Sequence, residues 1–588
     1  MRLKLTWLYS RISALGIISC TLFIVLAIHL SFEPRENTPL VGHTARDREA
    51  THFDNYILSD VPDNIFWFMQ ITDLHLSERQ DLSRVRDFIS FFTETVTVIQ
   101  PELVAISGDL TDARSNVHIR SRQSLSEWKS YHSAILSSGV LNITRIFDIR
   151  GNHDMFGVLH VNHTSDYFSR FGVRGREHAG SHFFKIIKPF GTYSFILLDA
   201  CPTVGVHFPL NFFGQLKPAE ETHVIKLALH TEGSNHTFWI GHYPTSTIRS
   251  SQLDVRALLG RSAYAYLCGH LHTIGRLITK MYTLQPQGFL ELELGDWRDG
   301  RYYRVVVVDN DLVSFVDVQL SSRATSFAPE WPVFVVTNPK NSNFLLPHKE
   351  PVSRITHSTH IRIVAWSNSQ ITHVSIKIDN RFIGNATHSV ANTLNGRRNV
   401  LFTLPWNVSE WMDSSSHTIQ VSVSDASGNT KTSSHPFVIN GDPTWDFSYA
   451  ANFVLHADHT YNLRVLFYLL VVGLICIFSI PRCIPRRLLA RATYAPRFVR
   501  GLLRFSQCGS LSTLVLLYFA YTVTGPIFAG YLVDSTLGVV FSFGIFVAGS
   551  FLQESLTYLY EIVQGCEQPA TTQRFLTPGK LAIHGYLF

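Results

Sequence analysis

Short apolar runs of the kind that form β-strands alternate with helical or loop stretches from about residue 55 to about residue 320. Residues 82–99 place apolar side chains at the spacing of a buried helix face. A strand, a helix and a strand in that order predict a parallel βαβ unit, so we expect an α/β domain over residues 55–325. The strand-like runs that end in Gly, Asp or His turns are NIFWFMQITD, ELVAISGD, TRIFDIRGNHD, TYSFILLDA, TFWIGHYP and AYAYLCGHLH. The later runs FLELEL, YYRVVVVD and VSFVDVQL, within residues 287–320, predict meander strands.

Residues 330–442 show a different pattern, in which apolar and polar positions alternate along short segments. The segments THIRIVAW, HVSIKID, RNVLFTLPW and HTIQVSVSD are separated by turns such as DNRFIG and DASGNT. This period of two is typical of strands with one buried face, and the spacing of the turns predicts an all-β, Ig-like sandwich. We expect this module to fold by itself and to carry no catalytic residue, because no His/Asp cluster ends its strands.

Several stretches without charged side chains predict membrane segments. Residues 12–32 contain no Asp, Glu, Lys or Arg and can cross about 30 Å of hydrocarbon. A cleaved signal peptide is the alternative, but the run is long for one and no Ala-x-Ala site closes it. We therefore predict a cytosolic tail and signal-anchor helix over residues 1–32. Residues 463–588 predict a C-terminal multi-span region of transmembrane helices, with uncharged stretches at 465–480, 505–533 and 535–553.

Basic residues and glycosylation sequons predict the orientation of these segments. Arg2, Lys4 and Arg11 precede the first stretch, and the loop 482–504 carries seven Arg and no acid. Positive charge collects on the cytosolic side of membranes, so both termini are expected in the cytosol and residues 33–463 outside it. All of the Asn-x-Ser/Thr sequons that we identify fall in that middle region, at Asn142, Asn162, Asn235, Asn385 and Asn407. We expect an integral, multi-pass glycoprotein of the secretory pathway or plasma membrane, with its α/β domain luminal or extracellular.

The composition supports this division of the chain. Charged residues make up only 16% of 588 residues, against about 25% in ordinary soluble domains. The net charge of +5 comes from the membrane-flanking parts, since residues 33–463 hold 37 Lys/Arg and 41 Asp/Glu. A mildly acidic globular part argues against nucleic acid as a partner. Of seven cysteines only Cys201 and Cys268 lie in it; a disulfide between them is the alternative to two buried free thiols, which we prefer.

Polar clusters with the chemistry of metal sites follow the strand-like runs. Because the carboxyl ends of strands in an α/β sheet face one crevice, residues far apart in sequence converge there. Asp, Asn and His offer oxygen and nitrogen ligands that suit Mn, Fe or Zn. A single cluster of this kind is most often only a turn; five in one order are hard to explain that way. The clusters are Asp73-Leu74-His75, Gly108-Asp109-Leu110-Thr111-Asp112, Gly151-Asn152-His153-Asp154, Gly241-His242 and Gly269-His270-Leu271-His272.

This ordered set resembles the motifs DxH, GDxxD, GNH(D/E), GH and GHxH of the calcineurin-like metallophosphoesterase superfamily, over about residues 65–320. The resemblance implies a four-layer αββα sandwich with two divalent metal ions of unknown identity. It implies that Asp73, His75 and His272 hold one ion, that Asn152, His242 and His270 hold the other, and that Asp109 bridges both. The resemblance also implies that His153 lies beside the scissile phosphate and either stabilises the phosphate or protonates the leaving oxygen. It implies further that Asp154 orients His153.

Two departures narrow the class within the superfamily. Purple acid phosphatases carry Tyr where this chain has Asp112, so the colour of a tyrosinate–iron pair is not expected. Protein Ser/Thr phosphatases carry GDxxDRG, whereas Ala113 and Arg114 follow Asp112 here. Arg150 precedes the GNH motif as in those enzymes, but one Arg does not make a phosphopeptide site.

The resulting prediction is a metal-dependent phosphoric ester hydrolase anchored in a lipid bilayer. Its substrate would be a phosphate mono- or diester, with lipid- and glycan-linked esters among the candidates. One alternative is a catalytically inactive phosphoesterase fold that serves as a binding or scaffold protein of the membrane. A multi-span transporter with a luminal sensor domain is a further alternative, disfavoured because the uncharged stretches hold almost no ionisable residue.

Overall fold

The computed structural model describes residues 57–483 apart from 115–120, 178–179, 323–326, 390–392 and 395–396, then residues 524–552 and a few isolated residues between 496 and 558. The predicted signal anchor at 12–32 and most of the basic loop 482–504 lie outside the described residues. The chain divides into two compact units. One is residues 34–456, and the other is residues 457–588 with the first 33 residues.

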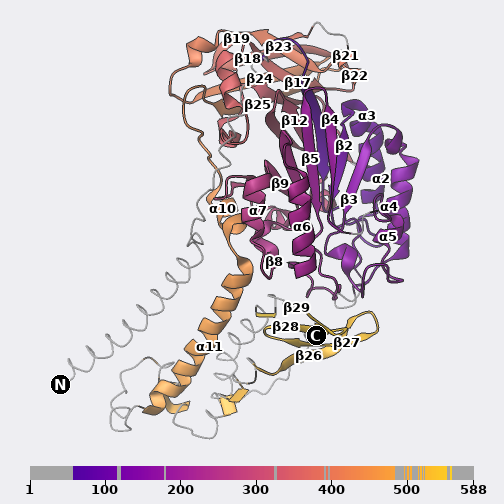
Figure 1. The fold of residues 1–588 in the computed structure, drawn as a ribbon, viewed down its shortest axis with the longest axis vertical. Coiled ribbons are helices and arrows are strands. Elements are labelled where there is room, and N and C mark those ends of the chain that lie inside the picture. The colour runs from indigo at the N-terminus through magenta and orange to yellow at the C-terminus, as the bar shows by residue number, and fades with distance from the viewer. Residues whose placement is uncertain are drawn as a thin grey trace, which may run out of the picture. The chain divides into compact units, whose positions relative to one another are not determined.

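Two mixed sheets form the centre of the α/β domain (Figure 1). The first has the order β13-β12-β1-β2-β3, with β1, β2 and β3 parallel. Its strands are β1 (Ile65–Ile71), β2 (Leu103–Ser107), β3 (Arg145–Ile149), β12 (Tyr302–Asp309) and β13 (Leu312–Gln319). The second has the order β10-β11-β9-β7-β5-β4. Its strands are β4 (His182–Lys188), β5 (Gly191–Leu198), β7 (His236–Gly241), β9 (Ala265–Cys268), β10 (Met281–Leu284) and β11 (Leu290–Glu293).

Helices cover the outer face of each sheet, which produces the four layers that the resemblance implies. The predicted helix at 82–99 is continuous from Ser83 to Ile99, with wider turns in its middle. The helices are α2 (Ser83–Ser90), η1 (Phe91–Val96), α3 (Thr97–Ile99), α4 (Leu125–Ser137), α5 (Phe168–Phe171), α6 (Pro218–His230), α7 (Val255–Ser262), α8 (His272–Arg276) and α9 (Trp297–Gly300). Short connecting elements are η3 (Val140–Asn142), η4 (His153–Met155), β6 (Gly214–Leu216), η5 (Thr245–Thr247) and β8 (Ile248–Ser250).

Three apolar cores hold these layers together. Phe68, Phe195 and Phe238 belong to the core between the two sheets, where their rings make edge-on and stacked contacts. Phe88 and Trp128 anchor α2 and α4 to the outer face of the first sheet. All seven residues of β1 are buried because this strand is covered on both faces, which explains its nearly continuous apolar sequence.

The predicted meander over 287–320 is only partly correct. β12 and β13 do form an antiparallel hairpin. However, β11 belongs to the second sheet, where it runs parallel to β9. The chain crosses between the sheets through residues 294–301, which include α9. Strand-like periodicity identifies a strand but not its partner, so this crossing could not be predicted from the sequence pattern.

The Ig-like domain consists of two packed four-stranded sheets, as predicted. Its apolar core includes Ile363, Ile376 and Val421 from facing strands. The sheet orders are β16-β17-β23-β20 and β19-β18-β24-β25. The strands are β16 (Val333–Asn338), β17 (His360–Trp366), β18 (Ile371–Ile378), β19 (Arg381–Asn385), β20 (Thr387–His388), β23 (Leu401–Pro405), β24 (His417–Asp425) and β25 (Thr430–Phe437). The smaller strands near them are β14 (Ser321–Ser322), β15 (Phe327–Ala328), β21 (Thr393–Leu394) and β22 (Arg397–Arg398), with the turns η6 (Ser342–Phe344), η7 (Val352–His357) and η8 (Val408–Trp411).

The Ig-like domain shares a buried interface with the α/β domain, which its sequence pattern did not reveal. Trp366 of β17 contacts Trp67 of β1 edge-on, with ring centroids 5.5 Å apart. The buried Arg362 guanidinium donates from Nε and Nη2 to the carboxylate of Asp309, at 2.8 and 2.9 Å. Lys340 and Glu350 form a second buried ion pair, joined by the hydroxyl of Tyr264. The domain therefore has its own core and also packs closely against the α/β domain.

Replacing Arg362 with Met should lower the free energy of unfolding of the full chain by about 3–5 kcal/mol, because the buried Asp309 carboxylate loses its partner. Arg381 is the matched control: its side chain is 71% exposed and its ion pair with Glu410 spans 3.8 Å. Arg381→Met should therefore change the stability by less than about 0.5 kcal/mol. Chemical denaturation of both variants measures the difference, and equal losses would show that the buried pair is not what joins the domains.

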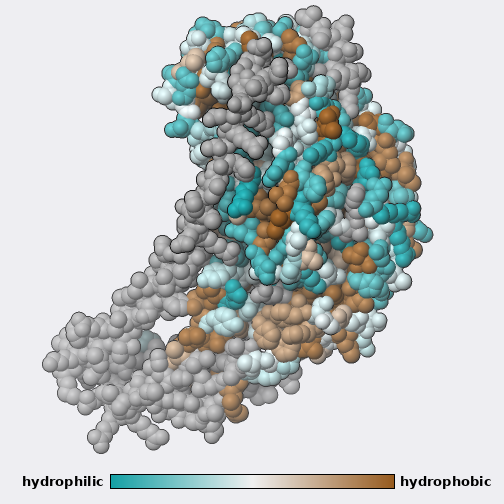
Figure 2. All heavy atoms as spheres, viewed as in Figure 1, coloured by the Kyte–Doolittle hydropathy of each residue, from teal (hydrophilic) through white to brown (hydrophobic). Residues whose placement is uncertain are grey.

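The C-terminal unit corrects the predicted transmembrane helices. Residues 526–552, expected to belong to two helical spans, form an antiparallel sheet of β26 (Pro526–Val533), β27 (Thr536–Phe541), β28 (Gly544–Val547) and β29 (Ser550–Leu552). Hydrophobic residues gather over this sheet (Figure 2). Its exposed large side chains include Phe528, Tyr531 and Leu537. Helix α11 (His459–Cys483) includes the uncharged stretch 465–480. Within the described part of the chain, no helix combines the length and the apolar character needed to cross a bilayer.

Candidate metal centre

The predicted ligands lie where strands of the two sheets end. Asp73, Asp109 and Asn152 follow β1, β2 and β3 of the first sheet. His242 and His270 follow β7 and β9 of the second sheet, and His272 begins α8. Since parallel strands place their carboxyl ends at one edge, the two sheets bring ligands from both halves of the domain to one place.

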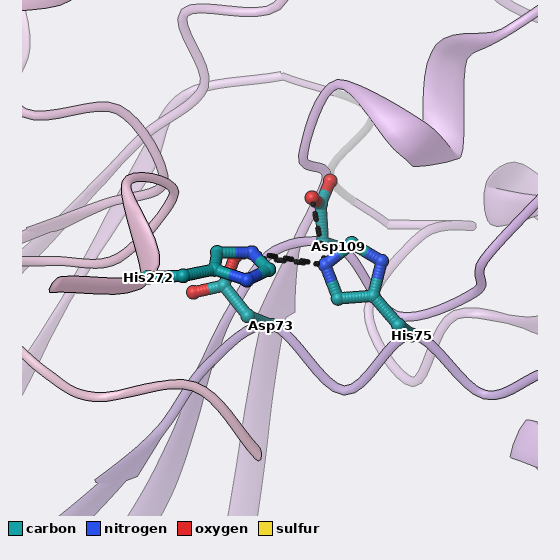
Figure 3. A group of neighbouring side chains, drawn as sticks. All are labelled: Asp73, His75, Asp109 and His272. Atoms are coloured by element: carbon teal, nitrogen blue, oxygen red, sulfur yellow. Dashed lines mark hydrogen bonds and ion pairs between the residues drawn. The ribbon is translucent and has the colours of Figure 1, made fainter. Parts of the chain in front are cut away.

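One group contains Asp73, His75, Asp109 and His272, whose ligand atoms all lie within 4.8 Å of one another. Figure 3 shows the imidazoles of His75 and His272 directed towards one another from separate loops. Their Nε2 atoms are 3.2 Å apart, and His272 Nε2 is 3.1 Å from Asp73 Oδ1. His75 Nε2 is 3.4 Å from Asp109 Oδ2.

A second group contains Asn152, His242 and His270. Asn152 Oδ1 lies 3.1 Å from both His242 Nε2 and His270 Nδ1, and these two nitrogens are also 3.1 Å apart. His242 Nε2 is 3.4 Å from Asp109 Oδ1. Asp109 therefore turns one carboxylate oxygen to each group. The two groups are those that the resemblance implies.

Backbone geometry explains why these motifs contain glycine and carry strain. A Cβ atom on Gly151 would stand 2.2 Å from Asp109 Oδ1, and one on Gly269 would stand 2.3 Å from Asp73 Oδ2. Left-handed backbone conformations, each costing about 1 kcal/mol or more outside glycine, occur at five of the predicted ligands. Those residues and their φ angles are Asp73 (55°), His75 (44°), Asp109 (51°), His270 (79°) and His272 (51°). Such strain persists only where the surrounding structure imposes it, and it is common at functional sites.

The electrostatics of the site reflect a dense group of buried ionisable side chains. Burial lowers the pKa of His272, but the carboxylates of Asp73 and Asp296 outweigh this and raise the pKa to about 10. Burial and the neighbouring Asp73 raise the pKa of Asp109 well above its usual range. Burial lowers the pKa of His75, His242 and His270, which favours the neutral form that binds metals. Burial also lowers the pKa of His153.

His153 lies next to both groups, as expected, but it is oriented by a different residue from the one we predicted. Its Nδ1 donates to the carbonyl oxygen of Asp112 at 2.6 Å, and its Nε2 lies 4.0 Å from Asp109 Oδ2. The Asp154 carboxylate instead accepts backbone N–H groups of Leu110, Thr111 and Gly151 at 2.9–3.0 Å. Asp154 can thus orient His153 only through the loop that carries it, and not by a hydrogen bond to its imidazole. Asp154 ties the loops after β2 and β3 together.

Two carboxylates behind the ligands were not assigned a role from the sequence. Asp112 Oδ1 lies 3.4 Å from His75 Nδ1, and Asp296 Oδ2 lies 3.4 Å from His272 Nδ1. Both carboxylates are buried. A carboxylate behind a histidine fixes which imidazole nitrogen faces a metal. Asp112 could have been found from its place in the GDxxD motif, but Asp296 sits in the crossing between sheets, in a Gly-Asp-Trp turn that carried no recognisable signal.

The residues fit divalent metal ions. In the second group two imidazole nitrogens and an amide oxygen lie 3.1 Å from one another. Without a cation between them, the lone pairs of the neutral imidazoles would face one another. Asp112 Oδ1 and Oδ2 and Asp296 Oδ1 are buried without hydrogen-bond partners, which adds negative potential behind the first group. The mixed oxygen and nitrogen donors suit Mn, Fe or Zn. Cys201 and Cys268, both buried, are free thiols, as preferred from the sequence.

The buried Arg150 is directed elsewhere. Its guanidinium donates to Asp199 Oδ2 from Nε at 2.8 Å and packs at 5.8 Å over the ring of Phe168. This side chain therefore serves an internal ion pair next to the GNH loop.

Comparisons with known proteins agree with the geometry. The family model described as "Calcineurin-like phosphoesterase" matches residues 66–273, and "TMEM62 Ig-like domain" matches residues 328–443. Transmembrane protein 62 of Mus musculus is 39% identical over 502 residues, which cover 85% of this chain and 75% of that protein. A protein of Arabidopsis thaliana named as a metallophosphoesterase is 26% identical over 438 residues, covering 64% of this chain and 58% of that protein.

Solved structures are more distant. GAP50, described as the anchor in the inner membrane complex of Plasmodium, matches 45% of this chain and 86% of its own with a TM-score of 0.28 and 10% identity, which carries no argument about activity. The identity and coverage of the mouse protein, together with the two matched domains, do show the family. This chain, whose calcineurin-like phosphoesterase domain precedes its Ig-like domain, belongs to the family of transmembrane protein 62.

Proposed function

We propose that this chain is a membrane-anchored phosphoesterase that binds two divalent ions and hydrolyses a phosphate mono- or diester. The observation that carries the proposal is the carboxylate of Asp109, which offers one oxygen to each of two groups of ligand atoms. Asp73, His75 and His272 would hold one ion, and Asn152, His242 and His270 the other. When bound, such a pair of ions polarises the phosphate ester and lowers the pKa of water.

His153 is the proposed general acid. Because a carbonyl oxygen only accepts, the Asp112 carbonyl requires the proton on His153 Nδ1 and leaves Nε2 facing the ligand groups. In the neutral ring Nε2 is therefore the acceptor, and burial lowers the pKa of His153. Acting as the acid requires Nε2 first to take up a second proton, such as the one released by the attacking water, which it would then donate to the leaving oxygen of the ester. Asp112 and Asp296 hold the imidazoles of His75 and His272 in place, and Asp154 holds the loop that carries His153.

The experiment that tests this function measures metal content and hydrolysis together. The full chain, purified in detergent, should contain close to two equivalents of Mn, Fe or Zn and should hydrolyse p-nitrophenyl phosphate or bis(p-nitrophenyl) phosphate. Chelation should remove the activity and metal should restore it. Two bound metals without turnover of either ester would favour the inactive binding or scaffold protein.

The proposed location places the catalytic domain in a lumen or outside the cell. It is supported by the basic residues before 12–32, by the seven Arg in 482–504 and by the sequons between them. The bilayer would then be a constant partner, and a phosphate ester carried by a lipid or a glycan would lie within reach.

The sequons make this topology testable, and they are not equivalent. Asn235 is partly buried, and its amide accepts from the Thr192 backbone and donates to Asp311 at 3.1 Å. A glycan on its Nδ2 would disrupt that contact. The Asn side chains of the other sequons are exposed; they are Asn142, Asn162, Asn385 and Asn407.

We therefore expect peptide-N-glycosidase to increase the mobility of protein expressed in cells. Asn142→Gln and Asn385→Gln should each lower the apparent mass before that treatment, whereas Asn235→Gln should leave it unchanged. A full chain without any glycan would contradict the proposed orientation.

A further inference from the structure

Helix α10 (Tyr449–His456) follows the Ig-like domain in the chain but packs against the α/β domain. Figure 1 shows it beside α7. The buried side chains of Ala451, Val454 and Leu455 pack on Met281 of β10. This helix lies beyond both matched domains, which end at residues 273 and 443.

The end of α10 is capped by the catalytic domain. The last carbonyl groups of a helix have no partners within it, so they need donors from elsewhere. Arg256 of α7 donates to the carbonyls of Leu455 and His456, each at 2.7 Å. Gln285 Nε2 donates to the Leu455 carbonyl at 3.0 Å. These hydrogen bonds fix the position of α10, in addition to its apolar contacts.

The same arginine connects α10 to the loop that carries His242. Arg256 Nε donates to Thr245 Oγ1 at 2.9 Å, and Thr245 lies three residues after His242. Thr245 in turn donates to the buried Glu291 carboxylate from both its backbone N and its Oγ1, at 2.7 Å each. The loop after β7 is thus held between α10 and the second sheet.

The apolar face of α10 reaches the loop that carries the other histidines. Leu271, which separates His270 from His272, and Ile278 pack against the same cluster as Leu455. Between these two contacts the backbone stays left-handed over residues 272–276, with φ between 51° and 67°. A turn of this kind persists only when its surroundings hold it. Helix α10 contacts this turn at both ends, through Leu271 and Ile278.

We propose that α10 is a positioning element of the metal site, which holds the loops of His242 and of His270–His272 in their ligand geometry. The inference rests on the proposed function for its metal. Ligation by three histidines then depends on a helix that only Ala457 and Asp458 separate from α11 in the chain.

The test uses the full chain with Leu455→Ala, which removes the contact beneath Leu271 and Ile278. Mn²⁺ titration of metal-stripped protein should show at least about 10-fold weaker binding, the size of loss expected when supports behind metal ligands are removed. Hydrogen exchange of residues 269–280 should become faster. Leu455→Met, which conserves volume, should restore both properties.

Leu227→Ala is the matched control, because Leu227 is a buried helical leucine on α6 in a different apolar cluster. It should change neither measurement. Equal losses in both variants, or unchanged Mn²⁺ affinity in Leu455→Ala, would overturn the inference. If Leu455→Ala does not fold, Arg256→Gln should show the same two effects, and unchanged values there would overturn it. Wild-type protein that takes up no metal would refute the proposed function; unchanged exchange of residues 269–280 would then refute the role of α10 as well.

Discussion

Asp109→Asn should remove both metal ions and nearly all turnover. Asp109 places one carboxylate oxygen 3.4 Å from His75 Nε2 and the other 3.4 Å from His242 Nε2, and the substitution removes its negative charge while keeping its shape. Substituting a residue that only supports a ligand typically lowers the metal affinity about 10–100-fold. Substituting a ligand shared by two ions should therefore lower the affinity for each ion by more than that. Metal content after gel filtration and the rate of p-nitrophenyl phosphate hydrolysis measure the effect.

Asp63→Asn is the control for this substitution. Asp63 is an exposed aspartate in the turn before β1, so its replacement should leave metal content and rate unchanged. A variant Asp109→Asn that still retains two ions and normal turnover would refute the bridging role, and with it the paired site that we propose.

His153→Gln should have a different signature. The side chain is not among the predicted ligands, so metal content should stay near that of the wild type. Loss of a general acid typically costs about 10²–10⁴-fold in rate. The loss should be larger for alkyl phosphates than for p-nitrophenyl phosphate, because a good leaving group needs little protonation. Rates for a series of esters that differ in leaving-group pKa measure this dependence.

The comparison between the two variants tests roles and not mere importance. Loss of metal in His153→Gln would make His153 a ligand. A rate loss that does not depend on the leaving group would make it an electrostatic stabiliser of the phosphate.

Much of the α/β domain could be predicted from the chain because its signals are local. Strands such as β1 and β9 are apolar runs that end in the metal motifs, and the helix at 82–99 shows its buried face in the spacing of Phe88, Phe92 and Val96. The motifs also name the candidate ligands, since the structure brings the Asp, Asn and His residues at these strand ends together.

The C-terminal region shows where such signals fail. The mean hydropathy of an uncharged stretch such as 535–553 is the same whether the residues form a helix or strands. Its length alone therefore led to the prediction of a membrane-spanning helix. The structure has turns at Asp534-Ser535 and at Ala548-Gly549 and strands between them. Gly538 and Gly544, which are unfavourable in a helix interior, were the available warning.

The sequence by itself determined the order of the domains, most strands of both, and which residues are candidate metal ligands. Only the tertiary structure decided which groups stand behind those ligands: Asp112 rather than Asp154 beside His153, Asp296 behind His272, and α10 beneath the histidine loops. It also decided that β11 leaves the predicted meander and that Arg362 joins the two domains. The physical reason is that periodicity and motif spacing record the chemistry of neighbouring residues, whereas these contacts join residues far apart in the chain and form only when the layers pack.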